Sequence, residues 1–231
     1  SGRSGGTGFR LESPALAETR DTYDLDLRHR FQLGARQEIV WGGGYRLSDS
    51  DLKDSVEVDL SRTSRSDQVV NVFVQDEIKL VPDRLRLMLG TKLEHNDYTG
   101  LEFEPGARLA WTPTDKQTVW GSVARAVRTP SQMDCDASYN VAVLPSRSPF
   151  SPPTLVSVLG NSEFESETLM AYELGYRIQA HRRLTLDAAA FVNDYDHLRS
   201  TDDRLDFSEL PNYAQVQSRL ANHAHGQTYG G

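Results

Sequence analysis

The densest group of side chains that could do chemistry in this 231-residue chain consists of three carboxylates, Asp49, Asp51 and Asp54. Hard oxygen ligands at such close spacing suit Ca²⁺. The segment lacks the glycine and the distal glutamate of an EF-hand loop, and Lys53 lies among the acids. The pattern therefore favours a solvated acidic loop, with these residues as weak calcium candidates, and indicates no other metal site.

Catalytic residue types are present, but their arrangement does not match a known nucleophile motif. No GxSxG elbow accompanies the serine, histidine and aspartate residues. The charged residues recur instead at strand period, where water solvates them, so we expect no enzymatic activity and no cofactor. The single cysteine, Cys135, excludes an intrachain disulfide. It lies between Asp134 and Asp136, whose charges disfavour a thiolate, and we interpret it as an inert loop thiol.

Composition excludes two further classes of protein. The chain has 25 lysines and arginines against 33 aspartates and glutamates, a formal net charge of -8, which argues against nucleic acid as a partner. No stretch approaches the roughly 18–20 apolar residues of a membrane-spanning helix. A transmembrane β-strand is short and alternates polar with apolar residues, so the mean hydropathy of -0.54 leaves a membrane barrel open. The chain starts at Ser1 without a methionine, and we expect it to be an excerpt of something longer.

The elements that must position these side chains show strand periodicity. Between Tyr23 and Leu33, apolar and aromatic residues dominate the odd positions and polar residues the even ones. Period two places the two sets on opposite faces of a sheet. Comparable alternation recurs at 39–47, 70–80, 85–93, 103–111, 119–127, 170–178 and 184–192. These eight segments predict an all-β fold of four antiparallel hairpins, with weaker strands at 7–12 and 203–230.

The connections between the predicted strands alternate in length. Tight turns fall near residues 34, 82, 114 and 181, and longer polar segments at about 48–66, 95–102, 129–165 and from 197. Short turns on one rim and long loops on the other are typical of an up-and-down transmembrane β-barrel. Aromatic residues toward strand ends, such as Trp41 and Trp111, fit an interfacial girdle.

Seven segments, taken together and in this order, resemble the barrel of TonB-dependent outer-membrane receptors. They are FVQDE at 73–77, LGTKLEHNDYTG at 89–100, PGARLAW at 105–111, VWGSVARAVRTPS at 119–131, ETLMAYELGYR at 167–177, AFVNDYD at 190–196 and NHAHGQTYG at 222–230. The resemblance covers about residues 20–230. Each segment alone is a weak signal, whereas the ordered set is specific.

The resemblance implies a barrel of about 22 strands, of which residues 1–231 supply about eight to ten as an open curved sheet. It also implies an N-terminal plug domain, a segment that contacts the TonB complex, and C-terminal strands, which this sequence lacks. The parent would reside in the lipid of a Gram-negative outer membrane. It would take up a scarce, bulky nutrient, either a ferric siderophore or a corrinoid, with energy supplied through TonB.

Within that framework the loop 129–165 is the candidate for ligand binding. It carries Tyr139, Arg147 and Phe150, and aromatic rings with a few polar groups suit an amphipathic chelate. Loops on a rigid scaffold often carry recognition, although packing at the rim explains the same residues equally well.

A second set of residues is expected to line the lumen if the leucine face meets lipid. It comprises Arg86, Arg108, Arg177 and Asp187. Pairing between neighbouring strands is the simpler role for any one of them. Two other functions remain open at this point: a passive porin-like barrel, and a soluble β-rich binding module.

Overall fold

The computed structural model describes residues 17–53, 58–146, 148 and 151–231. These residues form one twelve-stranded sheet and one short helix, α1 (Gln132–Asp136). No helix in this part of the chain has the length and apolar character to cross a bilayer. The strands are β1 (Ala17–Leu33), β2 (Gln37–Lys53), β3 (Val58–Leu60), β4 (Ser64–Val81), β5 (Leu85–Asn96), β6 (Gly100–Thr114), β7 (Gln117–Arg128), β8 (Ala137–Leu144), β9 (Thr154–Leu159), β10 (Glu167–His181), β11 (Leu184–Asp206) and β12 (Ala214–Gly230).

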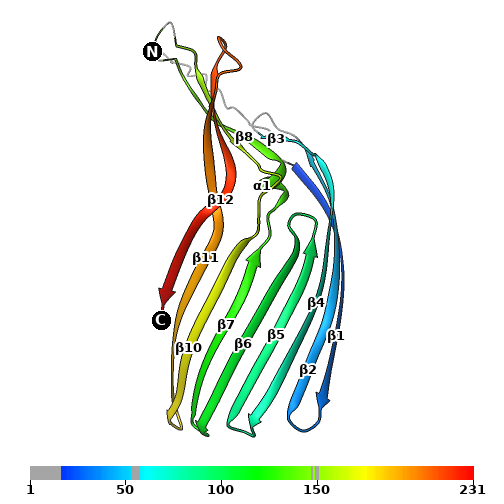
Figure 1. Ribbon diagram of the computed structural model, residues 1–231, viewed down its shortest axis with the longest axis vertical. Helices are drawn as coiled ribbons and strands as arrows, with labels where there is room; N and C mark the ends of the chain where they lie inside the picture. Colours follow the sequence, from blue (N-terminus) through cyan, green and yellow to red (C-terminus); the bar gives the residue numbers. More distant parts are fainter. Residues whose placement is uncertain (1–16, 54–57, 147, 149–150) are drawn as a thin grey trace, which may run out of the picture.

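Nine of these strands form an antiparallel meander in the order β1-β2-β4-β5-β6-β7-β10-β11-β12. All four predicted tight turns join neighbouring strands at one rim, which is the lower rim in Figure 1. Two of these turns require a left-handed residue, which Gly34 (φ 66°) and Asp83 (φ 59°) supply. Glycine adopts that conformation freely and aspartate tolerates it. The predicted fold class, an open curved sheet of an antiparallel barrel, is therefore confirmed.

The opposite rim differs from the predicted loops. The segment 48–66 is mostly strand, because β2 continues to Lys53 and β4 begins at Ser64. The segment 95–102 is a short turn of residues 97–99, and β11 runs past residue 197 to Asp206. Hydrogen-bonded ladders continue through these polar segments because polar side chains do not prevent backbone pairing. The predicted strand at 7–12 lies outside the described residues.

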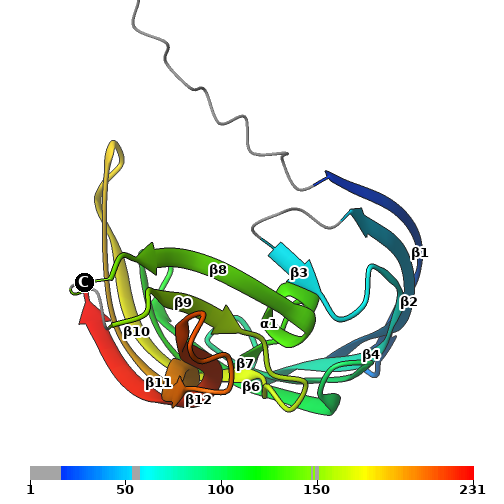
Figure 2. The ribbon, with the colours of Figure 1, turned by 90° about the horizontal axis from the view of Figure 1, so that it is seen from above.

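The segment 129–165 is also more ordered than a simple loop. It contains α1, β8 and β9, and β8 pairs with both β9 and β3. β9 pairs with β12 in parallel, from Thr154 opposite Ala214 to Leu159 opposite Arg219. This parallel pair is a local departure from the up-and-down order of the rest of the sheet, since β9 reaches β12 through a hairpin that reverses its direction. Figure 2 shows this segment lying inside the curve of the sheet.

Register separates the side chains of the meander into two faces. Tyr172 pairs with both Val123 and Val192, and Leu87 with Leu109, so apolar residues form continuous rows across the strands. Large apolar side chains on this face are exposed, with Leu25 72% and Leu174 62% accessible. The other face carries the charged rows. It is the concave face, because α1 lies within the curve and contacts polar residues of this set.

Buried apolar side chains are few, and two of them form a cluster beside α1. Among the described residues they are Leu52, Ala137, Phe164, Leu220 and Ala221. Met133 and Tyr139 pack against Leu52 and Ala137. A sheet with one apolar face exposed has no central core, so its order comes from strand pairing and from this contact region at one rim.

The two edges of the meander give a test of its open form. In the described residues β1 pairs only with β2, whereas β6 pairs with both β5 and β7. In the isolated 231-residue chain, refolded in detergent, amides of β1 should therefore exchange with deuterium faster than amides of β6. Mass spectrometry of peptides after exchange measures both. Equal protection of β1 and β6 would mean that the chain closes into a smaller barrel.

Candidate functional site

The concave face is the surface on which the four predicted lumen residues lie. Register places Arg86, Arg108, Arg177 and Asp187 on it together, opposite the leucine face. Arg177 donates from Nε to Asp187 Oδ2 at 2.7 Å across β10 and β11. Arg86 Nη1 lies 3.6 Å from Glu77 Oε1 on β4. Two of the three arginines thus have a carboxylate partner on a neighbouring strand.

Arg108 has a different partner. Its guanidinium carbon lies 4.4 Å from the centre of the Trp120 ring, which is a cation–π geometry. The indole in turn lies flat on Gly175 of β10, so closely that a Cβ at this glycine would be 2.3 Å from the ring atom Cε2. Only glycine leaves room for the indole here. In this stack of Gly175, Trp120 and Arg108, the indole therefore supports the Arg108 guanidinium on the concave face.

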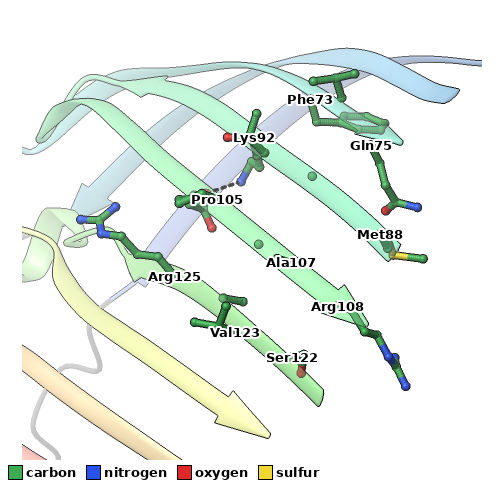
Figure 3. A pocket seen from close by; sticks show the side chains of 16 residues that line it. Phe73, Gln75, Met88, Lys92, Pro105, Ala107, Arg108, Ser122, Val123 and Arg125 are labelled. Atoms are coloured by element: carbon green, nitrogen blue, oxygen red, sulfur yellow. Dashed lines mark hydrogen bonds and ion pairs between the residues drawn. The ribbon is translucent and has the colours of Figure 1, made fainter. Parts of the chain in front are cut away.

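A shallow hollow of about 410 Å³ lies beside this stack. Its floor is nearly bare backbone, because Gly90 faces Gly106 across β5 and β6, and Gly106 faces Ala124 across β6 and β7. Lys92, Arg108 and Ser122 come from these three strands (Figure 3). Lys92 Nζ is 3.1 Å from Glu104 Oε1 and 2.7 Å from Glu94 Oε2. The lining is largely apolar, with Lys92 paired to two glutamates and Arg108 placed against the Trp120 ring.

The most deeply buried charged side chain of the described residues, Asp134, lies in the contact region around α1. Asp134 is 3% exposed and occupies the third helical position behind the N-cap Ser131. Its Oδ2 accepts hydrogen bonds from Ser131 N at 2.9 Å and Ser131 Oγ at 2.8 Å, which completes a capping box. Its Oδ1 pairs with Arg199 of β11. Arg128 of β7 lies 3.9 Å from Oδ2 and also pairs with Glu167 at 2.8 Å, so Arg199 and Arg128 together offset the charge of this buried carboxylate.

The other aspartate of α1 pairs with a different strand. Asp136 Oδ2 accepts from Arg65 Nη1 of β4 at 2.9 Å. Arg65 also pairs with Asp67 and lies 4.0 Å above the Tyr98 ring. The Tyr98 hydroxyl donates to Asp67 Oδ2 at 2.6 Å. Burial, together with this bond to a carboxylate, raises the pKa of Tyr98 above its usual value.

Cys135 lies between the two aspartates and is half-buried. Burial raises the pKa of its thiol, and the neighbouring Asp136 charge raises it further. Both effects oppose formation of the reactive thiolate, in line with the interpretation of an inert thiol.

The structure describes only one of the three residues predicted for ligand binding. Tyr139 lies on β8, half-buried against Leu52 and Ala137, which is the rim-packing arrangement. Burial raises the pKa of its hydroxyl. Arg147 and Phe150 lie outside the described residues, so the structure gives no position for their side chains. A recognition role for this set stays a prediction.

Two of the three calcium candidates lie on a strand rather than in a loop. Asp49 and Asp51 belong to β2, where they pair with Asp21 and Thr19 of β1, and Asp54 lies outside the described residues. Strand geometry fixes them at separate rungs rather than around a common centre. In the ranges 17–53, 58–146 and 151–231 no group of three or more histidine, cysteine or acidic side chains could hold a metal ion.

Sequence reasoning missed the residues that surround α1. The capping-box pattern Ser131-x-x-Asp134 was a readable local signal. The partners Arg65, Tyr98 and Arg199 gave none, because they come from strands far away in the sequence.

Comparisons with known proteins agree with this geometry. Residues 2–230 match the family model described as TonB dependent receptor-like, beta-barrel. The ferric enterobactin receptor of Pseudomonas aeruginosa is 28% identical over 135 residues, which is 58% of this chain and 17% of that receptor. The probable TonB-dependent siderophore receptor PirA of Acinetobacter baumannii is 22% identical over 134 residues, 58% of this chain and 18% of its own length.

Solved structures show the same fold. A crystal structure of a mutant ferric enterobactin receptor (PfeA) from Pseudomonas aeruginosa superposes with a TM-score of 0.73 at 19% identity. The superposition covers 93% of this chain and 32% of that receptor. The chain therefore spans about a third of the structure it matches, and less of the curated relatives.

The stack on Gly175 gives a testable prediction. Gly175→Ala should displace the Trp120 indole and destabilise the folded chain by about 1–3 kcal/mol, the usual cost of overpacking. Gly106→Ala is the matched control, since its nearest contact, Ala124 Cβ, would lie at an ordinary 3.6 Å. Urea titration in detergent, followed by tryptophan fluorescence, measures both. Equal stability of the two variants would contradict the close indole–backbone contact.

Proposed function

This chain belongs to the TonB-dependent receptor β-barrel family, and from that premise we propose that it is one wall of an outer-membrane receptor that imports a ferric siderophore. The parent would reside in the outer membrane of a Gram-negative bacterium and draw energy from the TonB complex through its N-terminal region. The two relatives, a ferric enterobactin receptor and a probable siderophore receptor, favour a ferric siderophore over a corrinoid.

The observation that carries the proposal is the separation of the two faces. Leucine, valine and aromatic side chains project from the convex face, where water would leave them exposed as a contiguous apolar patch. Lipid is the solvent that suits such a face. Charged rows on the concave face suit a water-filled interior through which a polar chelate passes. A soluble binding module would have no use for this arrangement.

The rim that carries α1 supports a capture role. In a barrel of this class the tight turns face the periplasm and the longer connections face outward. The segment 129–166 leaves β7 at the rim opposite the turn 115–116 and lies across the concave side (Figure 2). An incoming ligand would meet this segment before it reached the concave wall.

Transport assays on the full-length receptor test the proposal. Ferric enterobactin is the probe, and its uptake into cells that depend on this receptor should stop when an uncoupler dissipates the proton gradient. A passive porin-like barrel would continue to admit the probe at the same rate. Binding of the probe to purified receptor should persist without energy. Absence of both binding and uptake would refute a siderophore of this kind as the ligand.

A second prediction concerns the convex face. Leu89 lies on it, opposite Ala107 of β6, whereas its neighbour Met88 faces the concave side opposite Arg108. Leu89→Arg should cost about 2–4 kcal/mol if the residue lies near the bilayer midplane. Met88→Arg is the matched control and should assemble normally. Heat-modifiable migration in gels measures the folded fraction, and the reverse outcome would invert the assignment of the faces.

A third prediction concerns the segment that crosses the rim. Deleting about 140–160 removes most of β8 and β9 and leaves α1 and its buried ion pairs in place. The full-length receptor should then assemble but bind ferric enterobactin more weakly. Calorimetric titration measures the affinity. Unaltered affinity together with a lower yield of folded barrel would assign the segment to assembly instead of recognition.

A further inference from the structure

Two pairs of strands project beyond the rest of the sheet at the rim that carries α1. The first arm consists of residues 47–53 of β2 and 64–68 of β4, which pair only with each other and with β1. The second arm consists of residues 198–206 of β11 and 214–224 of β12, which pair with each other and with β9. Between them, β5 and β6 end at the turn 97–99. Above that turn, the ladder β12-β9-β8-β3 leads across the gap between the arms, and three residues join β3 to β4.

The helix α1 occupies this gap. Five strand spacings separate β4 of the first arm from β11 of the second, which is about 24 Å along the sheet at about 4.8 Å for each spacing. A single helix is about 10–12 Å across with its side chains. Long side chains from both walls must therefore reach inward to contact it, and arginines from both sides do so.

The two aspartates of the helix face opposite walls. Residues two apart in an α-helix are about 200° apart around its axis. Asp134 accordingly pairs with Arg199 of the second arm and lies near Arg128 of β7. Asp136 pairs with Arg65 of the first arm.

Neutral contacts repeat this two-sided attachment. Gln132 is 5% exposed, accepts from Ser50 Oγ of the first arm at 3.3 Å and donates to the Arg62 carbonyl at 2.9 Å. On the other side Asn161 donates from its backbone to the Asp134 carbonyl at 2.9 Å and from its side chain to the Leu220 carbonyl at 3.0 Å. The helix is thus attached to both arms through buried groups.

We propose that α1 is a cross-brace that holds the two arms of the rim at a fixed separation, with Asp134 and Asp136 as its charged ends. Each carboxylate is nearly inaccessible to water, so losing its charge removes the buried end of an ion pair: Asp134 with the half-exposed Arg199, or Asp136 with Arg65, which keeps Asp67 as a partner. One substitution then weakens the attachment to one arm and leaves the attachment to the other arm in place. This inference does not depend on what the receptor binds.

Distance measurements between the arms test the brace. Spin labels go on Asp51→Cys in the first arm and Asp203→Cys in the second, in a Cys135→Ser background of the full-length receptor in detergent. Both label sites are exposed. Double electron–electron resonance should give one narrow distance distribution for the parent. Asp134→Asn and Asp136→Asn should each broaden it by about one strand spacing, roughly 4.8 Å, and the double variant should broaden it further.

Three control variants distinguish the effect of a lost charge from the effect of a less stable helix. Asp115→Asn, in a turn at the opposite rim, should leave the distribution unchanged. Arg199→Gln removes the charge of a partner without touching the helix, and should act like Asp134→Asn. Ser131→Ala removes the N-cap hydroxyl but keeps both carboxylates, and should have the smaller effect.

Two results would overturn the brace. One is a distribution that stays as narrow in the double variant as in the parent. The other is a Ser131→Ala variant that broadens as much as Asp134→Asn while Arg199→Gln does not, since that would assign the effect to helix formation alone. A receptor that binds no ferric enterobactin would refute the transport proposal and leave these distances unaffected.

Discussion

The register of the antiparallel hydrogen-bond ladder determines which side chains share a face, and both surfaces of this sheet depend on it. Side chains alternate with a period of two, so a slip of one residue would carry a whole row to the other side. Leu87 pairs with Leu109, while the adjacent Met88 pairs with Arg108. The same register that leaves the leucines in an apolar row also brings Arg177 next to Asp187. The apolar convex face and the polar concave face are thus two results of one pairing pattern.

Much of this wall could be predicted from sequence because its information is local. Alternation within 85–93 or 170–178 needs no knowledge of the partner strand, and Pro82-Asp83 signals a turn by itself. The faces of Arg86, Arg108, Arg177 and Asp187 followed from the same alternation. What it could not give is the partner of each arginine. Arg108 lacks a facing carboxylate and stacks on Trp120 because Gly175 makes room for the ring.

The rim with α1 could not be predicted from the sequence, because the information that defines it is not local. Its contacts join residues far apart in the chain: Arg65 and Asp136 are separated by 71 positions, and Ser50 and Gln132 by 82. Polar and proline-rich stretches also read as loops, although β2, β4 and β11 continue into them as regular strands. Asp54, Arg147 and Phe150 lie outside the described residues, so the roles predicted for these three from the sequence remain hypotheses.

The bare floor of the concave hollow has a mechanical consequence. Gly90, Gly106, Ala124 and Ala171 form one row across β5, β6, β7 and β10. When a sheet curls, the side chains on its inner face crowd together, and a row with almost no side-chain bulk resists that crowding least. Glycines at defined positions are how sheets acquire local bends. We therefore expect the sheet to curve more tightly at the height of this row than elsewhere along the strands, so that the concave wall is most strongly bent close to Arg108.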